Sequence, residues 1–126
     1  MNIVLIEDNE GDVFLFEDLL VDMGYNAKSI KVLKDGERAV KYLVDCENHN
    51  IDLVFLDINL PKLNGHDILE QLHKDLYKRN VPVVILSSSS NVKDMKLLEL
   101  PCVVKYILKP IEPQQLTNTL NLFVKS

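Results

Sequence analysis

The stretch LVFLDINLPKLNG, residues 53–65, decides the fold class of this sequence. It opens with a continuous apolar run, Leu53 to Leu56, which stops at Asp57. A short apolar run of this kind is typical of a strand that is buried on both faces of a parallel sheet. The Pro, Asn and Gly residues that follow indicate a loop, and apolar residues then recur at helical spacing over residues 68–76. The stretch therefore predicts one strand, one loop and one helix.

The same unit recurs on both sides of this stretch. Apolar runs predict further strands at Ile3 to Ile6, at residues 30–33, at Val81 to Leu86 and at residues 103–108. Apolar repeats predict helices after them, marked by Phe16 to Met23, by Ala39 to Val44, by Met95, Leu98 and more weakly Leu97, and by Leu116 to Phe123. Strand and helix patterns thus alternate five times, which indicates an α/β domain with a central parallel sheet and helices on both faces.

Length and charge narrow the class of protein. The chain has 126 residues, which fits one domain, expected to span residues 1–126. It carries 14 Lys and Arg against 19 Asp and Glu, a net charge of −5, which argues against a direct nucleic-acid partner and against a polybasic membrane anchor. No apolar run approaches the ~18 residues of a membrane span, and the N-terminus lacks the basic start of a signal peptide.

The cysteine and histidine residues give no sign of a metal site or a disulfide framework. Cys46 and Cys102 lack CxxC spacing, so we expect two buried or half-buried free thiols and a cytoplasmic setting. His49, His66 and His73 lack the spacing of metal ligands, and we expect them to face solvent or to pack against neighbours.

Charged and polar residues follow four of the predicted strands. Glu7 and Asp8 follow the first strand, Asp57 the third, Ser87 the fourth and Lys109 the fifth. Ligand sites in parallel sheets lie beyond the carboxyl ends of the strands, so these side chains are expected to meet. Clustered carboxylates repel one another unless a cation neutralises them, and oxygen ligands favour Mg²⁺. With a lysine and a hydroxyl beside them, the set indicates phosphoryl transfer onto an aspartate.

These residues also carry a family resemblance. Over nearly its whole length the chain resembles the CheY-like receiver domain of two-component response regulators, and its opening resembles the stand-alone receivers found beside phytochrome-like and other histidine kinases. The resemblance rests on the Glu7-Asp8 pair, Asp57 with Leu60-Pro61 and Gly65 downstream, Ser87 at the end of an apolar strand, Tyr106, and Lys109-Pro110. It implies a flavodoxin-like, doubly wound sheet of five parallel strands in the order 2-1-3-4-5.

The resemblance implies a role for each acidic residue of the site. Asp57 is the residue that accepts a phosphoryl group from the phosphohistidine of a sensor histidine kinase. Asp8 binds Mg²⁺ directly and Glu7 binds it through water. Asp57 and the backbone carbonyl of Asn59 complete the ligands that the protein supplies to the metal.

Three further residues respond to the phosphoryl group in the family. Lys109 pairs first with Asp57 and then with the phosphoryl oxygens, and a cis bond between Lys109 and Pro110 aims the lysine at the site. Ser87 turns to hydrogen-bond a phosphoryl oxygen, and Tyr106 moves into the space that Ser87 leaves. This coupling converts a local change of charge into a change of the surface.

Three positions depart from the common family pattern. Glu7 replaces a more frequent aspartate, which bears on metal affinity rather than on role. Ser87 stands in place of threonine. Cys102 occupies a position that is usually glycine. If that position needs a positive φ, the cysteine carries strain, and with Pro101 it reshapes the loop before the output face.

The sequence thus predicts a stand-alone response regulator of a phosphorelay, a phosphoprotein that catalyses only its own phosphorylation and dephosphorylation. We expect no DNA-binding output segment, so the output is expected to be a downstream protein target or a phosphotransfer domain. Phosphorylation is also expected to tighten a homodimer through the fourth helix, the fifth strand and the fifth helix.

Two alternatives stay open. A degenerate receiver would act only as a binding module, although Asp8, Asp57, Ser87 and Lys109 are all intact. An aspartyl-phosphate phosphatase of the haloacid dehalogenase type needs a second aspartate two residues after its nucleophile. Asn59 stands at that position and cannot donate and retake a proton.

Overall fold

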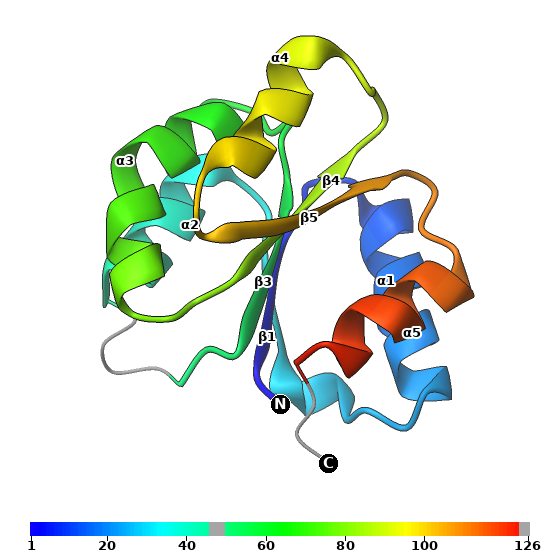
Figure 1. The fold of residues 1–126 in the computed structure, drawn as a ribbon. Coiled ribbons are helices and arrows are strands. Elements are labelled where there is room, and N and C mark those ends of the chain that lie inside the picture. Colours follow the sequence, from blue (N-terminus) through cyan, green and yellow to red (C-terminus); the bar gives the residue numbers. More distant parts are fainter. Residues whose placement is uncertain (46–49, 124–126) are drawn as a thin grey trace.

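Within residues 1–45 and 50–123, which the computed structural model describes, five parallel strands form the centre of the molecule (Figure 1). The sheet has the order β2-β1-β3-β4-β5, which confirms the expected flavodoxin-like topology. The strands are β1 (Ile3–Ile6), β2 (Ile30–Leu33), β3 (Leu53–Asp57), β4 (Val83–Ser87) and β5 (Val103–Leu108).

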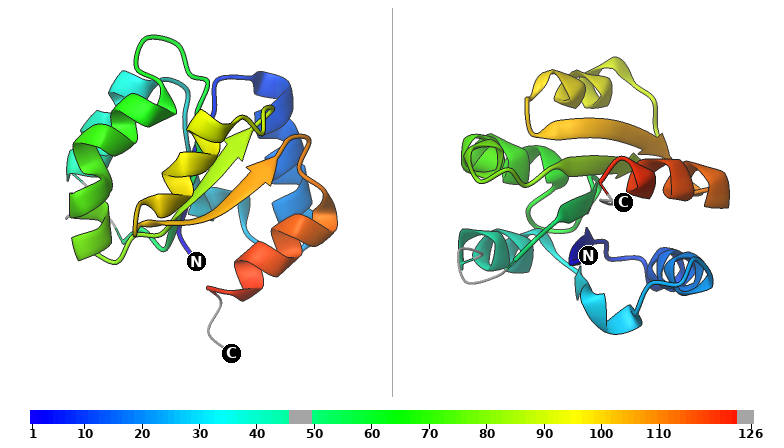
Figure 2. Two further views of the ribbon diagram at one scale, coloured as in Figure 1. Left: turned by 45° about the horizontal axis from the view of Figure 1, so that its top comes forward. Right: turned by 60° about the horizontal axis from the view of Figure 1, so that its bottom comes forward.

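Helices cover both faces of this sheet. They are α1 (Glu10–Asp22), α2 (Gly36–Val44), α3 (Gly65–Lys78), α4 (Val92–Met95) and α5 (Pro113–Asn121). Figures 1 and 2 show α1 and α5 on one face and α2, α3 and α4 on the other. The molecule is therefore a three-layer α/β sandwich, as the alternating pattern predicts.

The alternation of side chains along the strands builds a separate core on each face. Ile6 of β1 packs into the core under α2 and α3, whereas its neighbour Leu5 packs into the core under α1 and α5. In the second core Phe16 of α1 meets Phe55 of β3 edge to face, with ring centroids 4.8 Å apart. Both faces of β3 are buried, which explains the continuous apolar run in the sequence.

The parallel register brings the polar strand ends to one edge of the sheet. The pairing of β1 with β3 places Glu7 beside Asp57. The pairing of β4 with β5 places Lys109 just beyond Ser87, and the backbone N–H of Lys109 donates to the Ser87 carbonyl at 2.8 Å. Residues from four strand ends can therefore act on one small volume.

Short polar side chains cap the N-termini of four of the helices. Each N-cap accepts a hydrogen bond from the backbone N–H three residues later; these N-caps are Asn9, Asp35, Asn64 and Asn91. Pro113 occupies the first turn of α5, where a missing N–H does no harm. These caps therefore fix the residue at which each helix begins after its strand.

Two glycines allow a close approach of α2 and α3 to the loop between β3 and α3. A Cβ atom at Gly36 would lie 1.8 Å from the carbonyl oxygen of Leu63, and one at Gly65 would lie 2.6 Å from the Cα atom of Ile58. No side chain fits at either distance. The loop that follows Asp57 is therefore held by backbone-to-backbone packing on both helices.

The fourth helix differs from the sequence prediction. The α-helix Val92–Met95 is short and continues as a 3₁₀-helix over Lys96–Glu99. Leu97 is buried, whereas Met95 and Leu98 are 38% and 40% exposed. The apolar repeat at Met95 and Leu98 therefore does not mark the buried side. The buried positions are instead Asp94 and Leu97, whose spacing of three residues suits the three residues per turn of a 3₁₀-helix.

Two smaller expectations also change. β4 begins at Val83 rather than at Val81, because Pro82 has no N–H to give to a neighbouring strand.

Among the described residues other than glycine, only Lys62 and Asn80 have a positive φ, so the strain considered for Cys102 is absent. Cys102 is buried, and burial raises the pKa of its thiol.

The sequence predictions for Cys46 and His49 concern residues that lie outside the described part of the chain. Among the helices that the structure describes, none combines the length and the apolar character that crossing a membrane requires.

Candidate functional site

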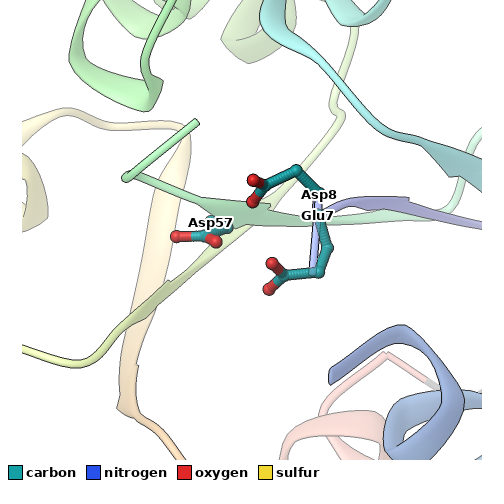
Figure 3. A group of neighbouring side chains, drawn as sticks. All are labelled: Glu7, Asp8 and Asp57. Atoms are coloured by element: carbon teal, nitrogen blue, oxygen red, sulfur yellow. The ribbon is translucent and has the colours of Figure 1, made fainter. Parts of the chain in front are cut away.

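Three carboxylates meet beyond the carboxyl ends of β1 and β3 (Figure 3). Glu7, Asp8 and Asp57 each offer one oxygen atom, and these atoms all lie within 4.8 Å of one another. Glu7 and Asp57 are buried, with 1% and 3% exposure, whereas Asp8 is exposed. The structure thus brings together the three acidic residues that the sequence places at strand ends.

This set of oxygen atoms suits a hard divalent cation. Carboxylate oxygens are preferred ligands of Mg²⁺, and carboxylates this close repel one another unless a cation is present. Burial, together with the neighbouring Asp57, raises the pKa of Glu7 to about 7. A cation bound beside Glu7 and Asp57 would remove this unfavourable accumulation of charge, so the residues present fit Mg²⁺.

Lys109 supplies positive charge to the same site. Its Nζ atom lies 2.5 Å from Glu7 Oε2, 3.0 Å from Asp57 Oδ2 and 3.1 Å from Asp12 Oδ2. Burial lowers the pKa of Lys109, but its hydrogen bonds to Glu7 and Asp57 outweigh burial and hold the pKa above its ordinary value. Lys109 therefore stays charged. The Lys109–Pro110 bond is cis, as predicted.

Backbone donors orient the two buried carboxylates. The N–H of Asn59 donates to Asp57 Oδ1 at 2.9 Å, and the N–H of Asn9 donates to Glu7 Oε1 at 3.1 Å. One oxygen of each carboxylate is therefore held by a loop, and the other contacts Lys109. The backbone carbonyl of Asn59 belongs to the loop after β3, and its part as a metal ligand stays a prediction.

Ser87 and Tyr106 are joined through Ser89. Ser87 is fully buried at the end of β4, and its Oγ atom accepts a hydrogen bond from the N–H of Ser89 at 3.0 Å. The half-buried Tyr106 of β5 donates its hydroxyl hydrogen to the carbonyl oxygen of Ser89. One residue of the loop after β4 therefore contacts both residues that the sequence predicts to switch.

Asp12 is a residue of the site that the sequence reasoning missed. It lies in the first turn of α1, and its carboxylate contacts Lys109. The polar stretch at residues 9–12 indicates a helix start, which is correct, but a helix that starts directly after Asp8 must also place its first turn at the site. The spacing between Asp8 and Asp12 is the signal that could have revealed this contact.

A second missed contact connects α3 with α4. His66, the second residue of α3, lies with its Nε2 atom 2.7 Å from Asp94 Oδ1 of α4. Asp94 is 8% exposed. The expectation that His66 faces solvent or packs omits this partner, which is 28 positions away in the sequence and carries no local pattern.

Comparison with known proteins defines the family. The family model of the response regulator receiver domain matches residues 3–121, and the chain therefore belongs to this family. Receiver domains serve two-component systems and are typically signalling proteins rather than classical enzymes. They bind Mg²⁺ at an acidic pocket.

Relatives and a solved structure agree with this assignment. The probable methanogenesis regulatory protein FilR2 of Methanothrix harundinacea is 32% identical over 120 residues, which cover 93% of this chain and 77% of the relative. The polar-differentiation response regulator DivK of Brucella ovis is 27% identical over 123 residues, which cover 98% of this chain and 95% of DivK. Two longer relatives are matched over only 49% and 42% of their length. The activities of those whole proteins are therefore not shown for this chain.

Among solved structures, the receiver domain of the sensor histidine kinase PA1611 from Pseudomonas aeruginosa has a magnesium ion coordinated in its active site cleft. It is similar to this chain with a TM-score of 0.79 at 25% identity, and the match covers 99% of this chain and 98% of that one.

We expect Mg²⁺ to stabilise the protein against unfolding, because it would neutralise the three clustered carboxylates. At a hundred times its dissociation constant, a ligand of the folded state adds about 2.7 kcal/mol to the free energy of unfolding. Thermal denaturation followed by circular dichroism should show a higher Tm with Mg²⁺ and a return to the original Tm with EDTA.

The variant Asp8→Asn should lose most of this stabilisation. Asp75→Asn is a matched control, because Asp75 lies on α3 and pairs with Arg79; it should keep the full effect. Equal stabilisation of Asp8→Asn and the wild type would contradict the assignment of Asp8 to the metal.

Proposed function

We propose that the protein is a response regulator that accepts a phosphoryl group on Asp57 from a sensor histidine kinase, in a cytoplasmic reaction that needs Mg²⁺. The observation that carries the proposal is the position of Asp57. Its carboxylate ends β3, lies in one cluster with Glu7 and Asp8, and contacts the Lys109 ammonium group at 3.0 Å. A carboxylate nucleophile, a metal-binding set of oxygens and a fixed cation are the groups that this transfer requires.

Asp57 acts as the nucleophile in the proposed reaction. One of its oxygens attacks the phosphorus atom of the phosphohistidine, the new P–O bond forms as the P–N bond breaks, and the electron pair of that bond stays on the imidazole nitrogen. Asn59 N–H and Lys109 each hold one oxygen of Asp57, so the carboxylate is oriented before transfer. Lys109 then contacts the phosphoryl oxygens and stabilises their charge.

Four groups would hold the metal ion. They are the carboxylates of Asp8 and Asp57, the carboxylate of Glu7 acting through water, and the backbone carbonyl of Asn59. When bound, Mg²⁺ withdraws negative charge from the phosphoryl oxygens.

Ser87 and Tyr106 carry the signal to the surface in this proposal. Ser87 exchanges its hydrogen bond with Ser89 for one to a phosphoryl oxygen. Because Tyr106 donates to the carbonyl of Ser89, a movement of this loop changes the position of Tyr106 and the surface of β5 and α4. A downstream protein target or a phosphotransfer domain responds to that surface.

The alternatives are weaker on chemical grounds. A phosphatase of the haloacid dehalogenase type needs an acid two residues after Asp57, and Asn59 offers only an amide. A receiver that only binds partners has no need of the contact between Lys109 and Asp57, which is present.

Intact-mass analysis after incubation with acetyl phosphate tests the proposal. We expect one phosphoryl adduct per chain with Mg²⁺ and none with EDTA. Absence of an adduct, both with acetyl phosphate and with a phosphorylated histidine kinase domain, would overturn the proposal. Multiple turnovers on small phosphomonoesters would favour the phosphatase instead.

Phosphorylation is also proposed to tighten a homodimer through α4, β5 and α5. Apolar side chains are exposed on this surface, namely Val92, Val104 and Leu108 with Met95 and Leu98. Sedimentation velocity should show the mass rising towards two chains when Mg²⁺ and beryllofluoride, which imitates a phosphoryl group, are added. An unchanged mass in both states would contradict the proposed dimer and favour a monomeric switch.

A further inference from the structure

Three carboxylates share the ammonium group of Lys109, and one of them lies outside the metal-binding cluster. Glu7 and Asp57 belong to the cluster of oxygens within 4.8 Å of one another, whereas Asp12 is not part of it. A protonated lysine has three N–H donors, and the three acceptors at 2.5, 3.0 and 3.1 Å occupy all of them. No donor of Lys109 is left for a phosphoryl oxygen.

We propose that Asp12 is a positioning residue, which holds Lys109 in the unphosphorylated protein and gives it up to the phosphoryl group when Asp57 is phosphorylated. The inference rests on the proposed function and adds to it a regulation of the same site. Asp12 thereby sets how readily Asp57 accepts a phosphoryl group.

Exposure decides which of the three contacts is exchanged. The side chains of Glu7 and Asp57 are 2% and 5% exposed, so either carboxylate would be left buried without its cation if Lys109 moved away. The side chain of Asp12 is 38% exposed. Water already reaches the Asp12 carboxylate and can replace Lys109 there. Breaking the contact between Asp12 and Lys109 therefore costs less free energy than breaking either of the other two.

The negative charge of the phosphoryl group also favours transfer of Lys109 from Asp12 to the phosphoryl group. An incoming phosphoryl group brings negative charge to Asp57, whose Oδ2 atom shares Lys109 with Asp12. Asp12 therefore competes with the phosphoryl oxygens for the lysine and repels them. Its removal should make phosphorylation faster, whereas a residue that merely aimed Lys109 at Asp57 would make phosphorylation slower when removed.

The variant Asp12→Asn isolates this effect from the folding of α1. The N-cap bond of α1 runs from the backbone N–H of Asp12 to Asn9 Oδ1, so the side chain of residue 12 takes no part in it. Glu10→Gln is a matched control, because Glu10 is an acid in the same helical turn, is 86% exposed, and pairs with Lys34 instead of Lys109.

The test measures the rate of phosphorylation by acetyl phosphate at saturating Mg²⁺, together with the dissociation constant of Mg²⁺. Asp12→Asn should raise the rate about two- to fivefold, the effect of losing one partly exposed ion pair. Glu10→Gln should stay near the wild-type rate, and Asp12→Glu, which keeps the charge, should be accelerated less than Asp12→Asn. The Mg²⁺ dissociation constant should stay the same in all variants, because Asp12 lies outside the metal cluster.

The outcomes separate this inference from the proposed function. A slower or unchanged rate in Asp12→Asn would overturn the inference while the adduct on Asp57 still supports the function. An equal acceleration in Glu10→Gln would also overturn it, because the effect would then come from net charge alone. No adduct in the wild type would overturn both.

Discussion

The variant Asp57→Asn is expected to take up no phosphoryl group, from acetyl phosphate or from a histidine kinase. An amide oxygen carries no full negative charge and is a far weaker nucleophile than a carboxylate. The other carboxylates of the cluster, Glu7 and Asp8, follow a different strand, so we do not expect them to replace Asp57. Intact-mass analysis should show the adduct in the wild type and its complete loss in the variant.

This loss should occur without loss of the fold. Asparagine has nearly the shape of aspartate and keeps an oxygen that can accept the hydrogen bonds from Asn59 N–H or Lys109. It also removes one charge beside the buried Glu7. Urea denaturation should therefore give a free energy of unfolding equal to or above that of the wild type. Asp75→Asn, on the exposed side of α3, should keep the full adduct; an adduct on Asp57→Asn at the wild-type level would remove Asp57 from its role.

The variant Gly36→Ala is expected to be strongly destabilised, by about 3 kcal/mol, the upper part of the range for overpacking. Its Cβ atom would lie 1.8 Å from the carbonyl oxygen of Leu63 and 2.7 Å from the carbonyl carbon. These are backbone atoms, so no side-chain rotation relieves the clash. Either α2 or the loop between β3 and α3 must shift. The free energy of unfolding from urea denaturation measures the effect.

Gly11→Ala provides the comparison for this prediction. A Cβ atom at Gly11 meets only a side-chain oxygen, Asn9 Oδ1 at 3.2 Å, and alanine favours the helix more than glycine does. We expect its free energy of unfolding to stay within about 1 kcal/mol of the wild type. If Gly36→Ala were as stable as Gly11→Ala, the close approach of α2 to the loop would not constrain the fold.

The sequence predicts the sheet and most of the site because both follow from short patterns. Apolar runs such as Leu53 to Leu56 must be strands buried on both faces, and parallel strands bring their polar ends to one edge. Glu7 and Asp57 are therefore expected at the same edge of the sheet as soon as the strands are correctly assigned. The topology and the cis Lys109–Pro110 bond came from the family resemblance rather than from these patterns.

The parts that the sequence does not predict depend on tertiary contacts. The region of α4 changes from an α-helix to a 3₁₀-helix, and it buries Asp94 and Leu97 instead of the apolar pair Met95 and Leu98. The contact of His66 with Asp94 joins two helices whose relative position no local pattern encodes. Asp12 carries an ordinary helix-start signal, and its second role exists only because β5 ends beside α1.

The two outer strands of the sheet give its edges opposite characters. β2 forms one edge, and the surface hollow beside it is lined by the charged side chains Lys31, Lys34, Arg38, Lys41 and Asp45. A second copy that approached this edge to extend the sheet would meet Lys31 of β2, and a charged side chain on an edge strand opposes strand-to-strand aggregation. β5, at the other edge, carries the exposed apolar side chains of Val104 and Leu108. Self-association is thus disfavoured at one end of the sheet and left open at the other, where we propose that Tyr106 and its loop respond to phosphorylation.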